Sequence, residues 1–503
     1  MVNKMNRNGW HSSRRAAAGR VAGLAGIAGI MVGLACGAGG QADDTGSFAS
    51  DAELLIGAYS TIHPGYDRFA DAASLDAAAD GLRRAAQGEP TLGEMYLAVQ
   101  RYLAAIRCEH TETEVPGEIR ERLAASMLPV QFEYVPDAGG EMRAIVVAVA
   151  DRVESVVVGD EIVSIEGRPV GEIFEAFSPY ISVDGSTDHT KVSLFGGRDD
   201  VGLTTFDILH PLLFGERESY RLRVASEDGA VRDVSVATID ELASLAMRGV
   251  PARQNLSDDG AVRWEMLDDT TAGLWVNTFV NYRTPIDAEA LFASVFEEIN
   301  ASGAERLVYD FRGVGGGSGD AQRALLRHLI DGPVESGGPT RVRAKRMGEY
   351  RPYMSTWDES VFEIPEIMFA ADGDGMFVVN PLIGGKRETV RPAPDAWRGE
   401  LVILIGPKNE SGATTLLAEL AWQREVTLIG EPTGGSAEGP TAGIIATMRL
   451  PRSGIEARLP LLRSKTSAPV DNATMGVSPD VLAPVTAESL RAGRDPAMEA
   501  ALR

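Results

Sequence analysis

Residues 308–320 read VYDFRGVGGGSGD, which is an apolar strand pattern followed by a glycine-rich loop and the start of a helix. Residues 401–421 read LVILIGPKNESGATTLLAELA and repeat the order of strand, loop and helix. Strands that are apolar throughout belong to a sheet that is covered on both faces. The strand runs GLWVNTF (273–279) and VTLIG (426–430) add to this pattern, so we predict an α/β core over residues 258–490.

Two further blocks precede this core. Residues 50–127 carry Ala and Leu at helical spacing, and Thr91 with Glu94 forms a capping-box pattern, so this block is predicted to be an N-terminal helical subdomain. Residues 128–250 instead show short alternating runs such as SYRLRVA and VRDVSVA, so this block is predicted to consist mostly of strands.

Within the second block, residues 157–177 (VVGDEIVSIEGRPVGEIFEAF) resemble the second half of a PDZ domain. The resemblance rests on the Gly159-Asp160 turn, on alternating strand residues and on a second turn at Glu166-Gly167. Any β-hairpin could supply two such turns, which is the alternative. We expect a PDZ-like, β-rich domain over residues 128–250.

The amino-terminal residues have the pattern of a targeting signal. Five basic residues precede an apolar run at 21–35, which is too short for a membrane span, so residues 1–36 are predicted to be a signal peptide followed by a flexible tether at 37–49. Cys36 lies in a segment that resembles a bacterial lipoprotein box, and cleavage near Ala42 is the alternative. We therefore expect an exported protein of the bacterial cell envelope, either periplasmic or anchored to the membrane by a lipid.

Composition excludes several functions. The chain has 503 residues with 48 Lys+Arg and 72 Asp+Glu, and its net charge of -24 disfavours nucleic acid as a partner. Two cysteines cannot form a disulfide framework, and the six histidines show no zinc-ligand spacing. Neither a GxGxxG nor a Walker A motif occurs in the glycine-rich loop. We therefore expect no metal and no cofactor.

Three separated segments could carry hydrolytic chemistry. Gly315 and Gly316 let backbone N–H groups approach a ligand oxygen, as an oxyanion hole requires, although a structural turn is an equal reading. Ser411 lies where a loop meets a helix and Gly412 N–H could stabilise an oxyanion, although serine is also a common N-cap. His110 follows a helix and is a candidate general base, although a lone histidine is more often structural.

Five segments occur in a characteristic order along the chain. They are STIHPGYDRF (60–69), AAIRCEHTETEVP (104–116), the glycine-rich loop, ESGATTLLAELAWQREVTLIGEPTGG (410–435) and GVSPDVLAPVT (476–486). Together they resemble peptidase family S41, which contains the tail-specific (C-terminal processing) proteases and the tricorn core, and the resemblance covers about residues 50–490. It implies a ClpP/crotonase-like α/β protease core, serine peptidase activity and peptides or unfolded proteins as substrates.

The resemblance also implies roles for individual residues. It places the nucleophile on Ser411. At the position where tail-specific members have a lysine, this chain has Ser436. The base is then His110, which matches the histidine of the tricorn-like branch. The family's supporting acid corresponds most closely to Asp471, offset by two positions, and Val314 stands where the family has asparagine.

The mechanism that follows is acyl transfer to water. His110 takes the proton of Ser411, the hydroxyl attacks a peptide carbonyl, and the N–H groups of Gly412 and of Gly315 or Gly316 hold the oxyanion. Because the lysine and asparagine of the family are replaced, the alternative is a catalytically inactive, S41-like scaffold that binds peptides. The catalytic interpretation requires that the helical block packs against the α/β core, because His110 and Ser411 lie far apart in the sequence.

Overall fold

The computed structural model describes residues 46–196, 202–249, 255–382 and 387–503. The predicted signal peptide (1–36) with Cys36, and most of the 37–49 tether, lie outside these residues, so they stay predictions. In the part of the chain that is described, no helix is long and apolar enough to cross a membrane.

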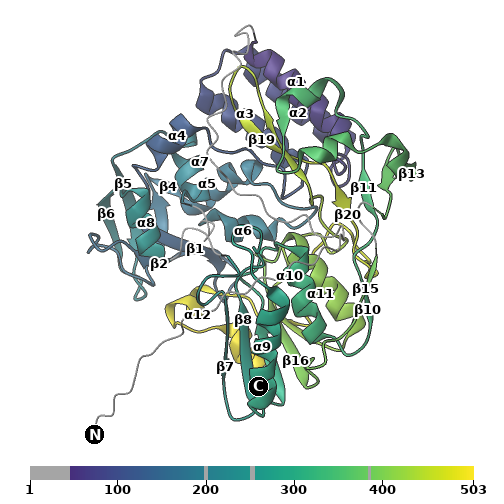
Figure 1. Cartoon of the computed structure of the whole chain (residues 1–503). Coiled ribbons are helices and arrows are strands. Elements are labelled where there is room, and N and C mark those ends of the chain that lie inside the picture. Colours follow the sequence, from purple (N-terminus) through teal and green to yellow (C-terminus); the bar gives the residue numbers. More distant parts are fainter. Residues whose placement is uncertain (1–45, 197–201, 250–254, 383–386) are drawn as a thin grey trace, which may run out of the picture.

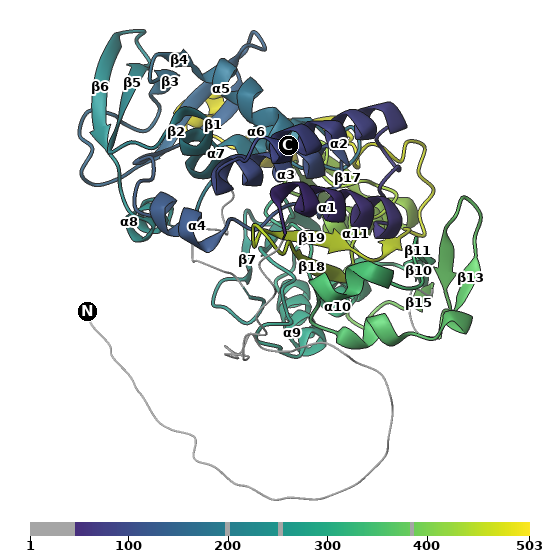
Figure 2. The same ribbon diagram turned by 90° about the horizontal axis from the view of Figure 1, so that it is seen from above.

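Helices fill the first described block, as predicted for residues 50–127. They are α1 (Phe48–Ile62), α2 (Ala72–Gln87), α3 (Leu92–Ala105) and α4 (Gly117–Leu123). The capping box forms at the start of α3: the Thr91 side chain accepts from Glu94 N–H, and Thr91 N–H donates to the Glu94 carboxylate at 2.8 Å. Figures 1 and 2 show α1, α2 and α3 lying together at one end of the molecule.

An antiparallel sheet forms the second block, in the order β1-β2-β3-β5-β6 with β4 paired to β3. Its strands are β1 (Val130–Pro136), β2 (Met142–Val149), β3 (Glu161–Ile165), β4 (Arg168–Pro169), β5 (Ser219–Ala225) and β6 (Val231–Ala237). In β5, buried and exposed residues alternate. One face of this strand therefore packs on a core while the other meets solvent.

The second block contains more helix than the prediction of mostly strands allowed. Helices α5 (Val170–Phe177), α6 (His189–Phe195), α7 (Thr205–Phe214) and α8 (Glu241–Arg248) lie within it, together with the short η1 (Ser178–Tyr180). Phenylalanines on α5, α6 and α7 bury their rings, and those of Phe195 and Phe206 meet Phe132 of β1 edge to face. These helices cover the apolar face of the sheet, which would otherwise be exposed to solvent.

The predicted α/β core is present as a six-stranded sheet in the order β21-β17-β16-β9-β8-β7. All pairs are parallel except β7 with β8. The strands are β7 (Val262–Met266), β8 (Thr271–Val276), β9 (Arg306–Asp310), β16 (Glu400–Ile405), β17 (Thr427–Gly430) and β21 (Val481–Leu482). Figure 1 shows β7, β8 and β16 at the end of the molecule opposite to α1.

Helices cover both faces of the core sheet, as its apolar strands predicted. On one face, Phe292 and Phe296 pack with Leu307 and Ile403 of the sheet. The helices of this face are α9 (Ala288–Ala301), α10 (Gly319–Leu329) and α11 (Ser411–Gln423). On the other face, Val402 and Leu404 belong to a smaller cluster with Ala497 and Ala501 of α13 (Pro496–Ala501).

Short strands from the segment before β16 join strands from the segment after β17. Two of these sheets have the orders β13-β14-β11-β20 and β12-β18-β19, and β10 pairs with β15. The strands are β10 (Val334–Ser336), β11 (Thr340–Val342), β12 (Met354–Ser355), β13 (Phe369–Ala371), β14 (Phe377–Val379), β15 (Glu388–Val390), β18 (Ile445–Arg449), β19 (Glu456–Pro460) and β20 (Arg463–Ser464). The remaining short elements are η2 (Gly348–Tyr353), η3 (Glu359–Glu363), η4 (Glu366–Met368) and α12 (Ala487–Arg491).

Candidate active site

His110 lies on a segment that runs from the end of α3 to the core, residues 107–114, here called the histidine strap. The strap is held against β19, where Arg458 N–H donates to Glu112 O at 2.9 Å. The helical block is thereby hydrogen-bonded to a strand that comes more than 300 positions later in the chain. This pairing brings the predicted base to the core.

A second histidine fixes the strap from the side of α1. His63 is fully buried, its Nδ1 accepts from Gly65 N–H at 3.1 Å, and its Nε2 lies 2.8 Å from Thr111 Oγ1. Burial, together with the nearby Arg343, lowers the pKa of His63 to about 3, so its ring is neutral at pH 7. Because Nδ1 accepts a hydrogen bond, Nε2 carries the ring proton. It donates a hydrogen bond to the hydroxyl of Thr111, the residue that follows His110.

Ser411 is the first residue of α11 and has a left-handed backbone with a φ of 52°. A non-glycine residue in this conformation is strained and is held by its surroundings, which is typical of functional sites. Glu410 occupies the N-cap position. Its side chain makes no cap hydrogen bond, and Ser411 lies one residue inside the helix, so Ser411 is not the N-cap residue.

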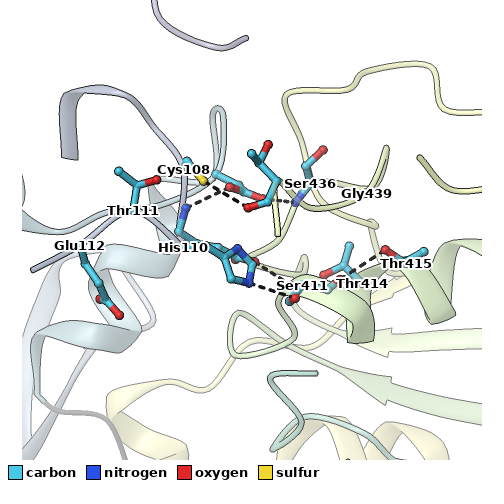
Figure 3. A network of polar contacts seen from close by, with 12 residues as sticks. Cys108, His110, Thr111, Glu112, Ser411, Thr414, Thr415, Ser436 and Gly439 are labelled. Atoms are coloured by element: carbon cyan, nitrogen blue, oxygen red, sulfur yellow. Dashed lines mark hydrogen bonds and ion pairs between the residues drawn. The ribbon is translucent and has the colours of Figure 1, made fainter. Parts of the chain in front are cut away.

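The two side chains predicted to meet lie in contact. His110 Nε2 is 3.0 Å from Ser411 Oγ, across 301 positions of sequence. Figure 3 shows the imidazole pointing from the strap to the hydroxyl at the head of α11. At this distance a neutral imidazole nitrogen can accept the hydroxyl proton.

The glycine-rich loop lies directly against this pair. Gly316 has a φ of 110°, and a Cβ on it would lie 3.2 Å from both Gly412 N and Ser411 Cβ. Gly317 has a φ of 131°, and a Cβ there would clash with the backbone of Phe279. Gly315 is less closely packed, because a Cβ on it would lie 3.8 Å from the nearest atom, Lys408 O. Bare backbone therefore faces the serine, as an oxyanion hole requires.

Gly412, the other predicted oxyanion donor, is the second residue of α11. Its N–H has no partner within the helix, because the first N–H groups of a helix lack an acceptor one turn earlier. The side-chain amide of Gln322 packs on its other side, where a Cβ on Gly412 would lie 2.6 Å from Nε2. Gln322 Nε2 in turn donates to Gly317 O at 3.2 Å, so α10 holds both glycine segments in place.

Sequence reasoning missed Asn409, which joins the two loops. Its fully buried side chain donates to Phe311 O at 2.6 Å and to Val314 O at 3.0 Å, and accepts from Gly406 N–H at 2.9 Å. The strand-loop-helix unit of the serine is thereby fixed to that of the glycines. The printed sequence offers no spacing signal for this task, because the partners are backbone atoms from another unit.

Ser436, at the position where a lysine was expected, uses its hydroxyl for structural hydrogen bonds. Its hydroxyl donates to Ala473 O at 2.8 Å and accepts from Arg68 Nη2 at 3.1 Å. Arg68 comes from the N-terminal block, is 4% exposed in its side chain and forms an ion pair with Glu438 at 2.7 Å. A cation is therefore present here, but a guanidinium remains protonated and cannot act as a base.

The carboxylate beside His110 is that of Glu109 rather than that of the predicted Asp471. Glu109 Oε1 lies 3.3 Å from His110 Nδ1, and the residue is buried. Asp471 is exposed, on a segment that turns into solvent where Thr474 N–H donates to the side chain of Asn472. Glu109 was not expected from the sequence, because consecutive residues of an extended segment point to opposite sides.

Asp184 holds the strap and the Ser436 loop together. This buried carboxylate accepts from Glu109 N–H at 3.0 Å and from Ser436 N–H at 3.2 Å. Burial raises the pKa of Asp184, whereas Arg68 and the two N–H groups lower it. The second block thus supplies a residue that positions both of its neighbours. Among the residues that the structure describes, no His, Cys, Asp and Glu cluster is arranged to hold a metal ion.

Comparisons with known proteins point to one family of peptidases. The model of peptidase family S41 matches residues 271–482. Mature CPAF in complex with lactacystin superposes with a TM-score of 0.56 and 16% identity, covering 89% of this chain and 95% of that chain. A serine-to-alanine variant of CPAF gives a TM-score of 0.57 and 15% identity, covering 89% and 94%.

The photosystem II D1 C-terminal processing protease is also similar, with a TM-score of 0.39 and 18% identity over 87% of this chain and 94% of that chain. No curated protein matches the sequence. The family match spans the core from β8 to β21 and includes the glycine-rich loop and Ser411. Residues 271–482 therefore match peptidase family S41, and this match supports a serine-type peptidase.

Proposed function

We propose that the protein hydrolyses peptide bonds with Ser411 as nucleophile and His110 as general base. The observation that carries the proposal is the 3.0 Å contact between His110 Nε2 and Ser411 Oγ at a strained backbone position. The imidazole takes the hydroxyl proton as Oγ attacks the carbonyl carbon, and gives that proton to the leaving amine. Water then attacks the acyl-enzyme with the same base.

The oxyanion formed in each step is held by backbone N–H groups. We assign this task to Gly412 and to Gly315 or Gly316, whose backbone lies beside the hydroxyl. Gly316 is the closer of the two. One such donor typically contributes about 3 kcal/mol of transition-state stabilisation. The reaction needs neither a metal nor a cofactor.

We assign distinct tasks to the three blocks. The N-terminal helical subdomain (50–127) supplies the base, the S41 core (258–490) supplies the nucleophile and the glycine loop, and the domain between them (128–250) is PDZ-like. The sheet of this middle domain is flanked by α5, and β3 and β4 form the hairpin that contains the Glu166-Gly167 turn. Peptides or unfolded proteins are the substrates, in keeping with the family.

We also propose that the protein works in the bacterial cell envelope. The support is the signal-peptide pattern of residues 1–36, with Cys36 in a segment that resembles a lipoprotein box. Expression of the full chain and of a Cys36→Ala variant in a bacterial host tests the anchor. The parent chain should partition with membranes and the variant should not. Equal partitioning would contradict lipid attachment at Cys36.

Labelling with a fluorophosphonate probe tests the catalytic proposal. We expect stoichiometric modification of the wild type, none of Ser411→Ala and at least a 100-fold slower reaction of His110→Ala. Ser478→Ala, which removes an exposed hydroxyl on another part of the core, is the matched control and should label as the wild type does. A folded wild type that fails to label would favour an inactive scaffold.

A further inference from the structure

The Glu109 carboxylate touches both members of the proposed catalytic pair. Its Oε1 accepts from Ser411 N–H at 2.8 Å and lies 3.3 Å from His110 Nδ1. The residue is only 7% exposed. One oxygen therefore contacts the backbone of the nucleophile and the far nitrogen of the base.

The backbone of the strap explains how neighbouring side chains reach one site. Arg107 has a left-handed backbone with a φ of 59°, and Thr111 N–H donates to Cys108 O at 3.0 Å, which closes a tight turn around residues 109 and 110. Asp184 accepts from Glu109 N–H inside the protein. In this turn the two side chains no longer point to opposite sides, and both face the head of α11.

We propose that Glu109 is the positioning carboxylate of the active site, setting the orientation and tautomer of His110 while fixing the backbone of Ser411. This inference rests on the proposed function. A carboxylate next to Nδ1 favours the tautomer with its proton on Nδ1. The lone pair of Nε2 is then directed to Ser411 Oγ–H. When Nε2 takes that proton, the resulting imidazolium lies beside a negative charge that stabilises it.

The Glu109 carboxylate lies at the start of α11. The carboxylate accepts a hydrogen bond from Ser411 N–H at the start of α11, and a helix N-terminus stabilises negative charge. The same bond occupies the N–H of Ser411. The oxyanion must therefore be held by Gly412 and the glycine loop, which is consistent with the close approach of Gly316.

A purely structural role is the competing explanation, since a carboxylate at a helix N-terminus also stabilises the helix. The pH profile separates the two. Glu109→Gln keeps the shape and an oxygen that can accept from Ser411 N–H, but removes the charge beside His110. We expect kcat/KM to fall at least 100-fold and the acid limb of its pH profile to move down by about one unit.

Asp471→Asn is the matched control. It also replaces a carboxylate by an amide, at the position that the sequence analysis proposed for the supporting acid. It should leave both the rate and the acid limb unchanged. Glu109→Asp keeps the charge at a shorter reach and should restore the position of the acid limb with only part of the rate. Urea unfolding of each variant shows that it is folded.

The outcomes are separable. The role of Glu109 would be overturned if Glu109→Gln left the acid limb in place and lost less than threefold in kcat/KM. An equal loss of kcat/KM in Asp471→Asn and Glu109→Gln would overturn it as well. In both cases the wild type and Glu109→Gln would still label with fluorophosphonate, and Ser411→Ala would not. A folded wild type that does not label refutes the proposed function itself.

Discussion

Replacing Gly316 by alanine tests whether the backbone of the glycine loop holds the oxyanion. The added Cβ would lie 3.2 Å from Gly412 N and from Ser411 Cβ, closer than an ordinary carbon contact. Its φ of 110° also costs an L-residue about 1–3 kcal/mol. The loop can relieve both only by moving away from the serine, which moves its N–H groups out of reach of the oxyanion.

The expected loss follows from these distances. A shift of a few tenths of an ångström weakens a hydrogen bond that must be short in the transition state, and removing one oxyanion donor costs about 3 kcal/mol, or about 100-fold in kcat. Hydrolysis of a fluorogenic peptide measures kcat and KM directly. We expect the loss mainly in kcat, because the interaction forms in the transition state.

Gly313→Ala is the control within the same loop. No atom lies within 4 Å of the position of its Cβ, and its φ is outside the left-handed region. We expect the rate of this variant to stay within about twofold of the wild type, in line with a surface substitution away from any contact. Full activity in Gly316→Ala, or equal loss in Gly313→Ala, would refute the assignment of the oxyanion donors.

Three further predictions concern stability, measured by urea unfolding. Burial lowers the pKa of His63 to about 3 and of His210 to about 4. The unfolded chain therefore binds protons more readily than the folded one below pH 6.5, and the free energy of unfolding should fall by about 3 kcal/mol per histidine between pH 6.5 and pH 4. His210→Leu should reduce that pH dependence, and an unchanged slope would contradict it. Asn409→Ala leaves buried backbone groups unpaired and should cost about 3 kcal/mol, whereas a loss under 1 kcal/mol would show that the loops are held otherwise. Glu438→Gln leaves three ion-paired cations without their shared carboxylate and should cost about 3 kcal/mol, and an unchanged midpoint would argue against this network.

Local patterns predicted the core and the contact between the two proposed catalytic residues. Continuous apolar runs identified β9, β16 and β17 as strands of a sheet covered on both faces, and the capping pattern at Thr91 fixed the start of α3. The contact between His110 and Ser411 was predicted by combining segments that are individually weak. These features follow from residues close to one another in sequence, or from their order along the chain.

The predictions that failed depended on partners from elsewhere in the chain. The middle block contains helices α5 to α8 because its sheet needs an apolar cover, which alternation in the strands does not reveal. Glu109 lies beside His110 because of a tight turn that follows the left-handed Arg107 and is held by Asp184 of another block. Asn409 binds backbone carbonyls, which leave no trace in the sequence of its partners.

The 301 positions between His110 and Ser411 impose an order of events during synthesis. When the imidazole leaves the ribosome, the hydroxyl it serves has not been made, and β19, which anchors the strap, comes later still. A nascent or truncated chain that ends before α11 therefore contains only one member of the proposed catalytic pair. The proposed site can therefore form only late in synthesis, after most of the chain has been made.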